Sequence, residues 1–380
     1  MGFAETLVRT LKNNDVRFIT DVPGNVLTPL LKGVSRGRAA RSMRRALLLT
    51  LTALACATPS RAQPVDLAGK TVTLAIATPS GGGYDLYGRL VARTIGRYLP
   101  GNPTMVPQNM PGAGSLIAAN WLANVAPKDG SAIAIIPSAT LFENLLGNAQ
   151  ARFDARALRW LVSLNDYTAV AAAWHETPLM TADDLFSKQF LVGSNAPASD
   201  TTVWPLLLNA LIGTRTKVVK GYAGTAGIAL AMERGEVQGV IGDDWASIKA
   251  NKASWLSEKK VRILMQMTAD RHADLSDVPL ASEFAKDEDN RRVLALFVAR
   301  QKYGRPFLAP PGTPDAVTAV YREAFAKLVA DPDFVRDTSQ AQLIIKVATG
   351  AEVTALVEEI HGYPKPVIER ASALIRSITQ

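Results

Sequence analysis

Residues 70–140 repeat one pattern, in which a short apolar run is followed by a loop of small residues and a helix-like segment. The first apolar run, 70–78, is rich in β-branched residues and is bounded by Gly69 and Pro79, which indicates a buried strand. Further strands are expected at 104–108 and 131–136, and helices at 84–99 and 116–125. Three such steps in about seventy residues favour a mostly parallel sheet covered by helices.

The pattern restarts after a link at roughly 153–166 and predicts a second α/β unit. Strands are expected at 169–174, 189–193, 217–220, 239–242 and 261–267, with helices at 181–186, 203–211 and 226–234. The tail predicts helices at 315–330, 332–340, 351–360 and from 366 onward. We expect the tail to return to the first unit. Lobe 1 is therefore expected to comprise 63–165 plus 296–380, and lobe 2 to comprise 166–295.

The loop at 79–85 (PSGGGYD) joins the first strand to the first helix. Backbone N–H groups at a helix N-terminus favour an anion, and glycines let a ligand approach the backbone closely. A nucleotide loop does not fit, because G-x-x-x-x-G-K-[ST] is absent and the third glycine of G-x-G-x-x-G would be Leu86. An ordinary structural turn remains the alternative.

Residues 43–62 predict a secretory signal peptide. Arg44 and Arg45 precede an apolar run of about twelve residues, and small residues stand at the expected cleavage site. Cleavage after Ala62 is preferred over lipid attachment at Cys56, the chain's one cysteine. Because 42 residues precede Met43, either translation starts at Met43 or residues 1–42 are a relic fusion. Export implies a periplasmic protein.

The net charge of +8 lies mostly in residues 1–62, which hold ten basic and three acidic residues. The other 318 residues carry 32 basic and 31 acidic groups, so a nucleic-acid partner is not expected. One cysteine excludes an internal disulfide, and His175, His272 and His361 are far apart in the sequence. No metal and no cofactor are expected.

Residues 5–31 resemble the extreme N-terminus of thiamine-diphosphate decarboxylases of the sulfopyruvate and phosphonopyruvate type. The resemblance covers fewer than thirty residues, and one βα fragment cannot hold that cofactor. It nevertheless leaves an enzyme, either a decarboxylase-related fusion or a hydrolase, as an alternative. No G-x-S-x-G follows residue 62, which disfavours the hydrolase. No catalytic residue is assigned.

An ordered set of motifs resembles the substrate receptors of tripartite tricarboxylate transporters, also called Bug proteins. The segments, in family order, are 80–89 (SGGGYDLYGR), 109–114 (NMPGAG), 127–132 (PKDGSA), 222–224 (YAG), 235–238 (GEVQ) and 309–314 (APPGTP). The resemblance implies a two-lobed α/β fold of the type II periplasmic-binding-protein class, closing on a small carboxylate. Ser80, Met110 and Gln238 depart from the family pattern, so the identity of the acid stays open.

The same resemblance implies the ligand-binding residues. In lobe 1 they are Ser80, Gly81, Gly82, Gly83, Tyr84, Ser138 and Thr140. In lobe 2 they are Ser194, Ser199, Asp200, Thr201, Tyr222, Gly224 and Thr225. Asp85 and Asp243 are candidates to receive a ligand ammonium or hydroxyl, although for each hydroxyl an ordinary helix cap is the competing interpretation. The implied partners are a small organic acid and the membrane permease, and we expect a monomer. A ligand-sensing protein without a transport role is the remaining alternative.

Overall fold

The computed structural model describes residues 65–379, and the predicted signal peptide, Cys56 and residues 5–31 lie outside them. The described chain builds two sheets. The first has the order β11-β4-β10-β3-β1-β2. Its strands are β1 (Thr71–Ile76), β2 (Thr104–Asn109), β3 (Ala132–Ile135), β4 (Arg159–Ser163), β10 (Pro306–Ala309) and β11 (Ala348–Thr349).

The second sheet has the order β7-β6-β8-β5-β9. Its strands are β5 (Ala169–Trp174), β6 (Phe190–Ser194), β7 (Thr216–Lys220), β8 (Gly239–Asp244) and β9 (Val261–Gln266). This confirms the expected two-lobed α/β architecture. The boundaries proposed for the lobes stay predictions.

Both sheets are mixed, because strands entering from the other sheet run against their neighbours. In the first sheet β1 pairs parallel with β2 and β3, whereas β10 lies antiparallel between β3 and β4. In the second, β6 pairs parallel with β7 and β8, whereas β5 is antiparallel to β8 and β9. The expectation of mostly parallel sheets therefore holds for the main strand direction and fails at these crossing strands.

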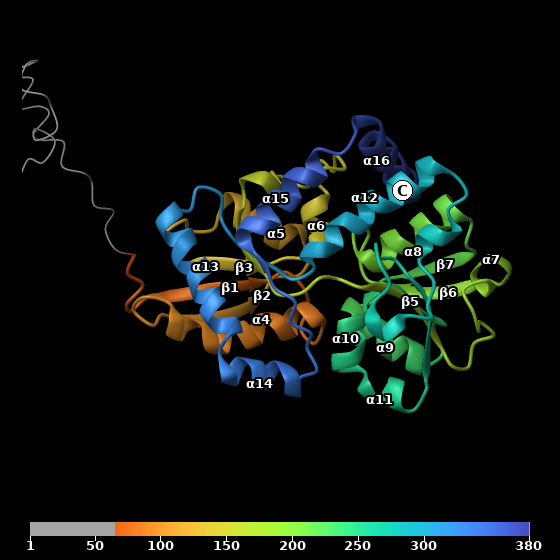
Figure 1. Ribbon diagram of the computed structural model, residues 1–380, viewed down its shortest axis with the longest axis horizontal. Helices are drawn as coiled ribbons and strands as arrows, with labels where there is room; N and C mark the ends of the chain where they lie inside the picture. The colour runs from red at the N-terminus through yellow and green to blue at the C-terminus, as the bar shows by residue number, and fades with distance from the viewer. Residues whose placement is uncertain (1–64, 380) are drawn as a thin grey trace, which may run out of the picture. The chain divides into compact units, whose positions relative to one another are not determined.

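Helices flank both sheets (Figure 1). Those after the strands of the first sheet are α4 (Gly83–Thr94), α5 (Leu116–Asn124), α6 (Ser138–Phe142), α13 (Asp315–Val329), α14 (Pro332–Gln340) and α15 (Gly350–His361). Those of the second are α7 (Asp184–Ser187), α8 (Asp200–Ile212), α9 (Gly224–Glu233), α10 (Trp245–Asn251) and α11 (Ala253–Ser257). Helices α12 (Glu288–Ala299) and α16 (Lys365–Thr379) pack against each other and against α8.

Local chemistry explains several helix ends. Pro332 occupies the first turn of α14, and the Asp331 carboxylate accepts the backbone N–H groups of Asp333 and Phe334 at 2.6 and 3.1 Å. Thr349 and Glu352 form a reciprocal capping box at the start of α15. No helix in residues 65–379 is both long and apolar enough to cross a membrane.

The structure corrects three local expectations. The link predicted at 153–166 contains β4, whose Trp160, Leu161 and Val162 are fully buried in the core. The chain forms α6 directly after the strand predicted at 131–136, where no helix was predicted, and the helix predicted at 181–186 is one turn, α7. These elements have only four or five residues each, which is too few for the periodicity of apolar residues to identify them.

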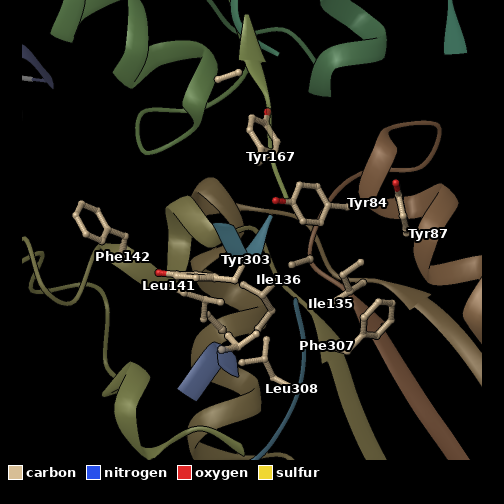
Figure 2. Packing of buried hydrophobic residues seen from close by; sticks show 14 of the residues in the cluster. Tyr84, Tyr87, Ile135, Ile136, Leu141, Phe142, Tyr167, Tyr303, Phe307 and Leu308 are labelled. Atoms are coloured by element: carbon tan, nitrogen blue, oxygen red, sulfur yellow. The ribbon is translucent and has the colours of Figure 1, made fainter. Parts of the chain in front are cut away.

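The two connections between the sheets pair with each other. The N–H of Leu164 donates to the carbonyl of Arg305, and the N–H of Arg305 donates to the carbonyl of Asn165, both at 3.1 Å. Figure 2 shows the buried side chains beside this crossing, among them Tyr84 and Tyr167. The crossing therefore lies in the buried core and brings residues from both lobes together.

Candidate binding cleft

A cleft with a free volume of about 90 Å³ is lined by loops from both sheets. Eleven of the residues implied by the family resemblance line this cleft. They are Ser80, Gly82, Gly83, Tyr84, Thr140, Ser199, Asp200, Thr201, Gly224, Thr225 and Asp243.

Three helix N-termini meet at this cleft. Helices α4, α8 and α9 begin at Gly83, Asp200 and Gly224, and all three residues line it. None of the three N-cap residues supplies a side-chain acceptor. The first N–H groups of a helix have no partner inside the helix, and the helix dipole adds partial positive charge there. The cleft is therefore built to hold an anion.

The two lobes approach each other closely across the cleft. A Cβ atom placed on Gly82 would lie 3.7 Å from Thr225 Oγ1, and one placed on Gly114 would lie 3.0 Å from the Cβ of Ala198. These distances leave room for small residues only. The glycines of the first loop thus allow the two sets of helix N-termini to face the same small space.

Gly83 provides a direct test of this packing. A Cβ there would lie 2.1 Å from Ser247 Oγ and 3.0 Å from Arg305 Nη2, so Gly83→Ala must displace the Ser247 side chain of α10 or the start of α4. We expect Gly83→Ala to weaken carboxylate binding about tenfold or more, because a misplacement of about 1 Å disrupts a preorganised site. Calorimetric titration measures this. Gly227→Ala, in α9 and outside the lining of the cleft, is the matched control, since its new Cβ meets only ordinary contacts. Equal loss in both variants would contradict the role of Gly83.

Hydroxyl groups of the second lobe form a compact network at the start of α8. Thr201 donates to Asn195 Oδ1 at 2.5 Å, and Ser199 donates to the carbonyl of Ala196 at 2.7 Å. The Ser194 and Thr202 hydroxyls bond to each other. These bonds orient the loop at 194–199, which carries Asn195, a cleft residue that sequence reasoning missed.

Five of the implied residues do not line the cleft: Gly81, Asp85, Ser138, Ser194 and Tyr222. Ser138 and Ser194 are fully buried behind it. Asp85 accepts bonds from Gly81 N–H at 3.0 Å and from Arg89 Nε at 2.9 Å. Burial opposes its charge, but the bonds from Arg89 and Gly81 hold the pKa of Asp85 below its ordinary value. Asp85 therefore shapes the first loop.

Two buried ion pairs beside the cleft were not predicted. Arg305 bonds to Asp244, and Arg300 bonds to Asp200, which itself lines the cleft. Arg305 is 1% exposed and Asp244 is fully buried. The partners are 61 and 100 residues apart in the sequence, so no local pattern could have indicated either pair.

Arg305 is surrounded by aromatic rings as well as by its carboxylate. Its guanidinium lies 4.2 Å from the ring centre of Tyr84 and 5.1 Å from that of Tyr167. Nη2 also donates to Ser247 at 2.9 Å. Burial opposes its charge, yet the Asp244 carboxylate raises the pKa of Arg305, so the floor of the cleft carries a fixed cation. Burial also raises the pKa of Tyr84 to about 12, so its hydroxyl stays neutral.

Asp243, near the end of β8, differs from Asp200 and Asp244 because it forms no ion pair within residues 65–379. One oxygen accepts the N–H of Asp244 at 2.9 Å. Burial raises the pKa of Asp243 to about 7, and the nearby negative charge of Asp244 also raises it. Its carboxyl group can therefore donate a proton in a hydrogen bond near neutral pH. In residues 65–379 no three His, Cys, Asp or Glu side chains are grouped to hold a metal ion.

The comparisons confirm the fold and the resemblance to the receptor family. The chain is 27% identical over 345 residues to the UPF0065 protein in the tcbD-tcbE intergenic region of Pseudomonas sp. (strain P51), covering 86% of this chain and 94% of that protein. No protein-family model matches the chain. The decarboxylase resemblance of residues 5–31 finds no support in these relatives.

Two solved structures share the fold. The periplasmic binding protein BugD has a TM-score of 0.63 at 18% identity, covering 82% of this chain and 98% of BugD. MatC from Rhodopseudomonas palustris, solved with bound malate, has a TM-score of 0.61 at 20% identity, covering 81% of this chain and 99% of MatC.

Proposed function

We propose that the protein is a periplasmic solute-binding receptor that captures a small organic carboxylate in its inter-lobe cleft for a tripartite tricarboxylate-type transporter. The observation that carries this proposal is the convergence of three helix N-termini without side-chain caps on one small cleft. Such N–H groups bind a carboxylate by hydrogen bonds that its charge strengthens.

The relatives support the same class of function. MatC holds malate, and BugD is a periplasmic binding protein. The signal peptide predicted at 43–62 would export this chain to the same compartment, where a membrane permease would receive the ligand. Binding would proceed by closure of the two lobes around the cleft, without covalent chemistry.

A thermal-shift screen of the purified protein against tricarboxylates, dicarboxylates, aromatic acids and sulfonates tests the proposal. A carboxylate present at a hundred times its dissociation constant should raise the free energy of unfolding by about 2.7 kcal/mol. We expect a saturable increase in the melting temperature with at least one acid and none with a neutral amide of the same shape. Failure of every carboxylate to shift the transition would contradict the proposal.

A further inference from the structure

A second cavity adjoins the cleft on the far side of Asp243. Its free volume is about 160 Å³, against about 90 Å³ for the cleft itself. Thr225, Ala226, Asp243 and Ser247 line both cavities, so the two share a wall. We call the second cavity the side chamber.

The side chamber is lined by residues of α9, α10, α11 and β8, and by Gly81. The three helices lie on one side of the second sheet (Figure 1). Part of its wall is polar and is formed by Thr225, Asp243, Ser247 and Lys252. The rest is apolar and includes five side chains that are at most 4% exposed: Ile228, Met232, Val240, Ile248 and Trp255. An apolar tail placed there would leave water without losing any hydrogen bond. The volume is close to the roughly 150 Å³ of a cavity that accepts benzene.

The polar groups of the side chamber do not favour a second anion. Lys252 lies 3.7 Å from Glu233 and 5.0 Å from the ring centre of Trp255, so its charge already has partners. At the shared wall, the Asp243 carboxyl group repels another carboxylate when it is ionised. The cleft alone has room for little more than one carboxylate group and a few carbons.

We propose that the side chamber is a specificity subsite, and that the preferred ligand is a monocarboxylate with a branched aliphatic or single-ring tail. The carboxylate lies at the three helix N-termini and the tail enters the side chamber past Asp243. This inference rests on the proposed carboxylate-binding function and narrows its substrate class.

The test is calorimetric titration of the purified protein with 4-methylpentanoate, succinate and propionate. Succinate has a carboxylate in place of the isopropyl group of 4-methylpentanoate, so the two acids match in shape and differ in the charge of the tail. Each buried methylene tightens binding about fourfold. We expect 4-methylpentanoate to bind about tenfold or more tighter than succinate and propionate, and phenylacetate to bind in the same range as 4-methylpentanoate.

The outcomes separate this inference from the proposed function. Succinate binding as tightly as 4-methylpentanoate, or more tightly, overturns the side-chamber subsite and leaves carboxylate binding intact. If neither these acids nor those of the thermal-shift screen bind, both proposals are overturned.

Two variants localise the effect. Ala229 lines the side chamber and not the cleft, so Ala229→Leu should fill the chamber and lower the affinity for 4-methylpentanoate to that for propionate, with propionate unchanged. Leu230→Phe, at an exposed position of the same helix, is the control and should change neither. Ile248→Val enlarges the chamber without filling it, and should raise the affinity for phenylacetate relative to 4-methylpentanoate. An unchanged preference in both chamber variants overturns the proposal.

Discussion

Replacing Arg305 by methionine should lower the free energy of unfolding by about 3–5 kcal/mol, because Asp244 would keep its charge in the core without a counterion. Asp244 is fully buried, and its remaining neighbours donate only neutral hydrogen bonds, such as that from the N–H of Thr168 at 3.0 Å. Burial already raises the pKa of Asp244. Without the arginine the pKa should rise further, so the deficit should shrink as the pH falls. Denaturant unfolding at pH 7 and pH 5 measures both effects.

Two comparisons identify the cause. The double variant Arg305→Met with Asp244→Asn removes both charges and should recover much of the lost stability. Arg336→Met removes a cation from an exposed pair with Asp333, and should leave the stability almost unchanged because solvent screens that pair. If the free energy of unfolding of Arg305→Met were no lower than that of Arg336→Met, the buried pair would not be what holds the connection at Arg305 to the second lobe.

The sequence predicts the longer elements of the fold well, and the reason is periodicity. Strand β1 and helix α4 lie close to the ranges expected from their apolar residues, and α14 matches its expected range, 332–340. In each of these elements the apolar residues recur over several helical turns or several strand positions, so the sequence favours one type of secondary structure. Elements of four or five residues, such as β4 and α7, offer no such repetition.

The first loop of the cleft could be predicted because a local motif contains its residues, as with Gly82 and Gly83. The charges around the cleft could not, because Asp244 and Arg305 meet only after the chain has crossed between sheets. The contact between Ser247 of α10 and Gly83 could not be predicted for the same reason, because these residues also meet only in the folded chain. Apolar residues of α9 and α11 look like ordinary core in the sequence, and only their packing leaves the side chamber free.

The affinity for an anionic carboxylate should fall about tenfold between pH 6 and pH 8, because Asp243 changes its charge in that interval. Burial raises the pKa of Asp243 to about 7. Below pH 7 the neutral carboxyl tolerates the ligand's negative charge and can donate a hydrogen bond to it. Above pH 7 the carboxylate repels the ligand. Titration calorimetry at constant ionic strength, with the tightest acid from the screen, measures the change.

Asp243→Asn is the control variant, since asparagine keeps the shape and cannot ionise. Its affinity should be nearly constant from pH 6 to pH 8 and close to that of the unaltered protein at pH 6. The other charged or titratable groups around Asp243 are Asp200, Asp244, Arg305, Lys252, Tyr84 and Tyr167. Both arginine–aspartate pairs are already formed, and burial holds the pKa values of both tyrosines far above this interval. A pH dependence that persists in Asp243→Asn would therefore assign the titration to another group, and affinity that rises with pH would indicate a ligand ammonium at Asp243.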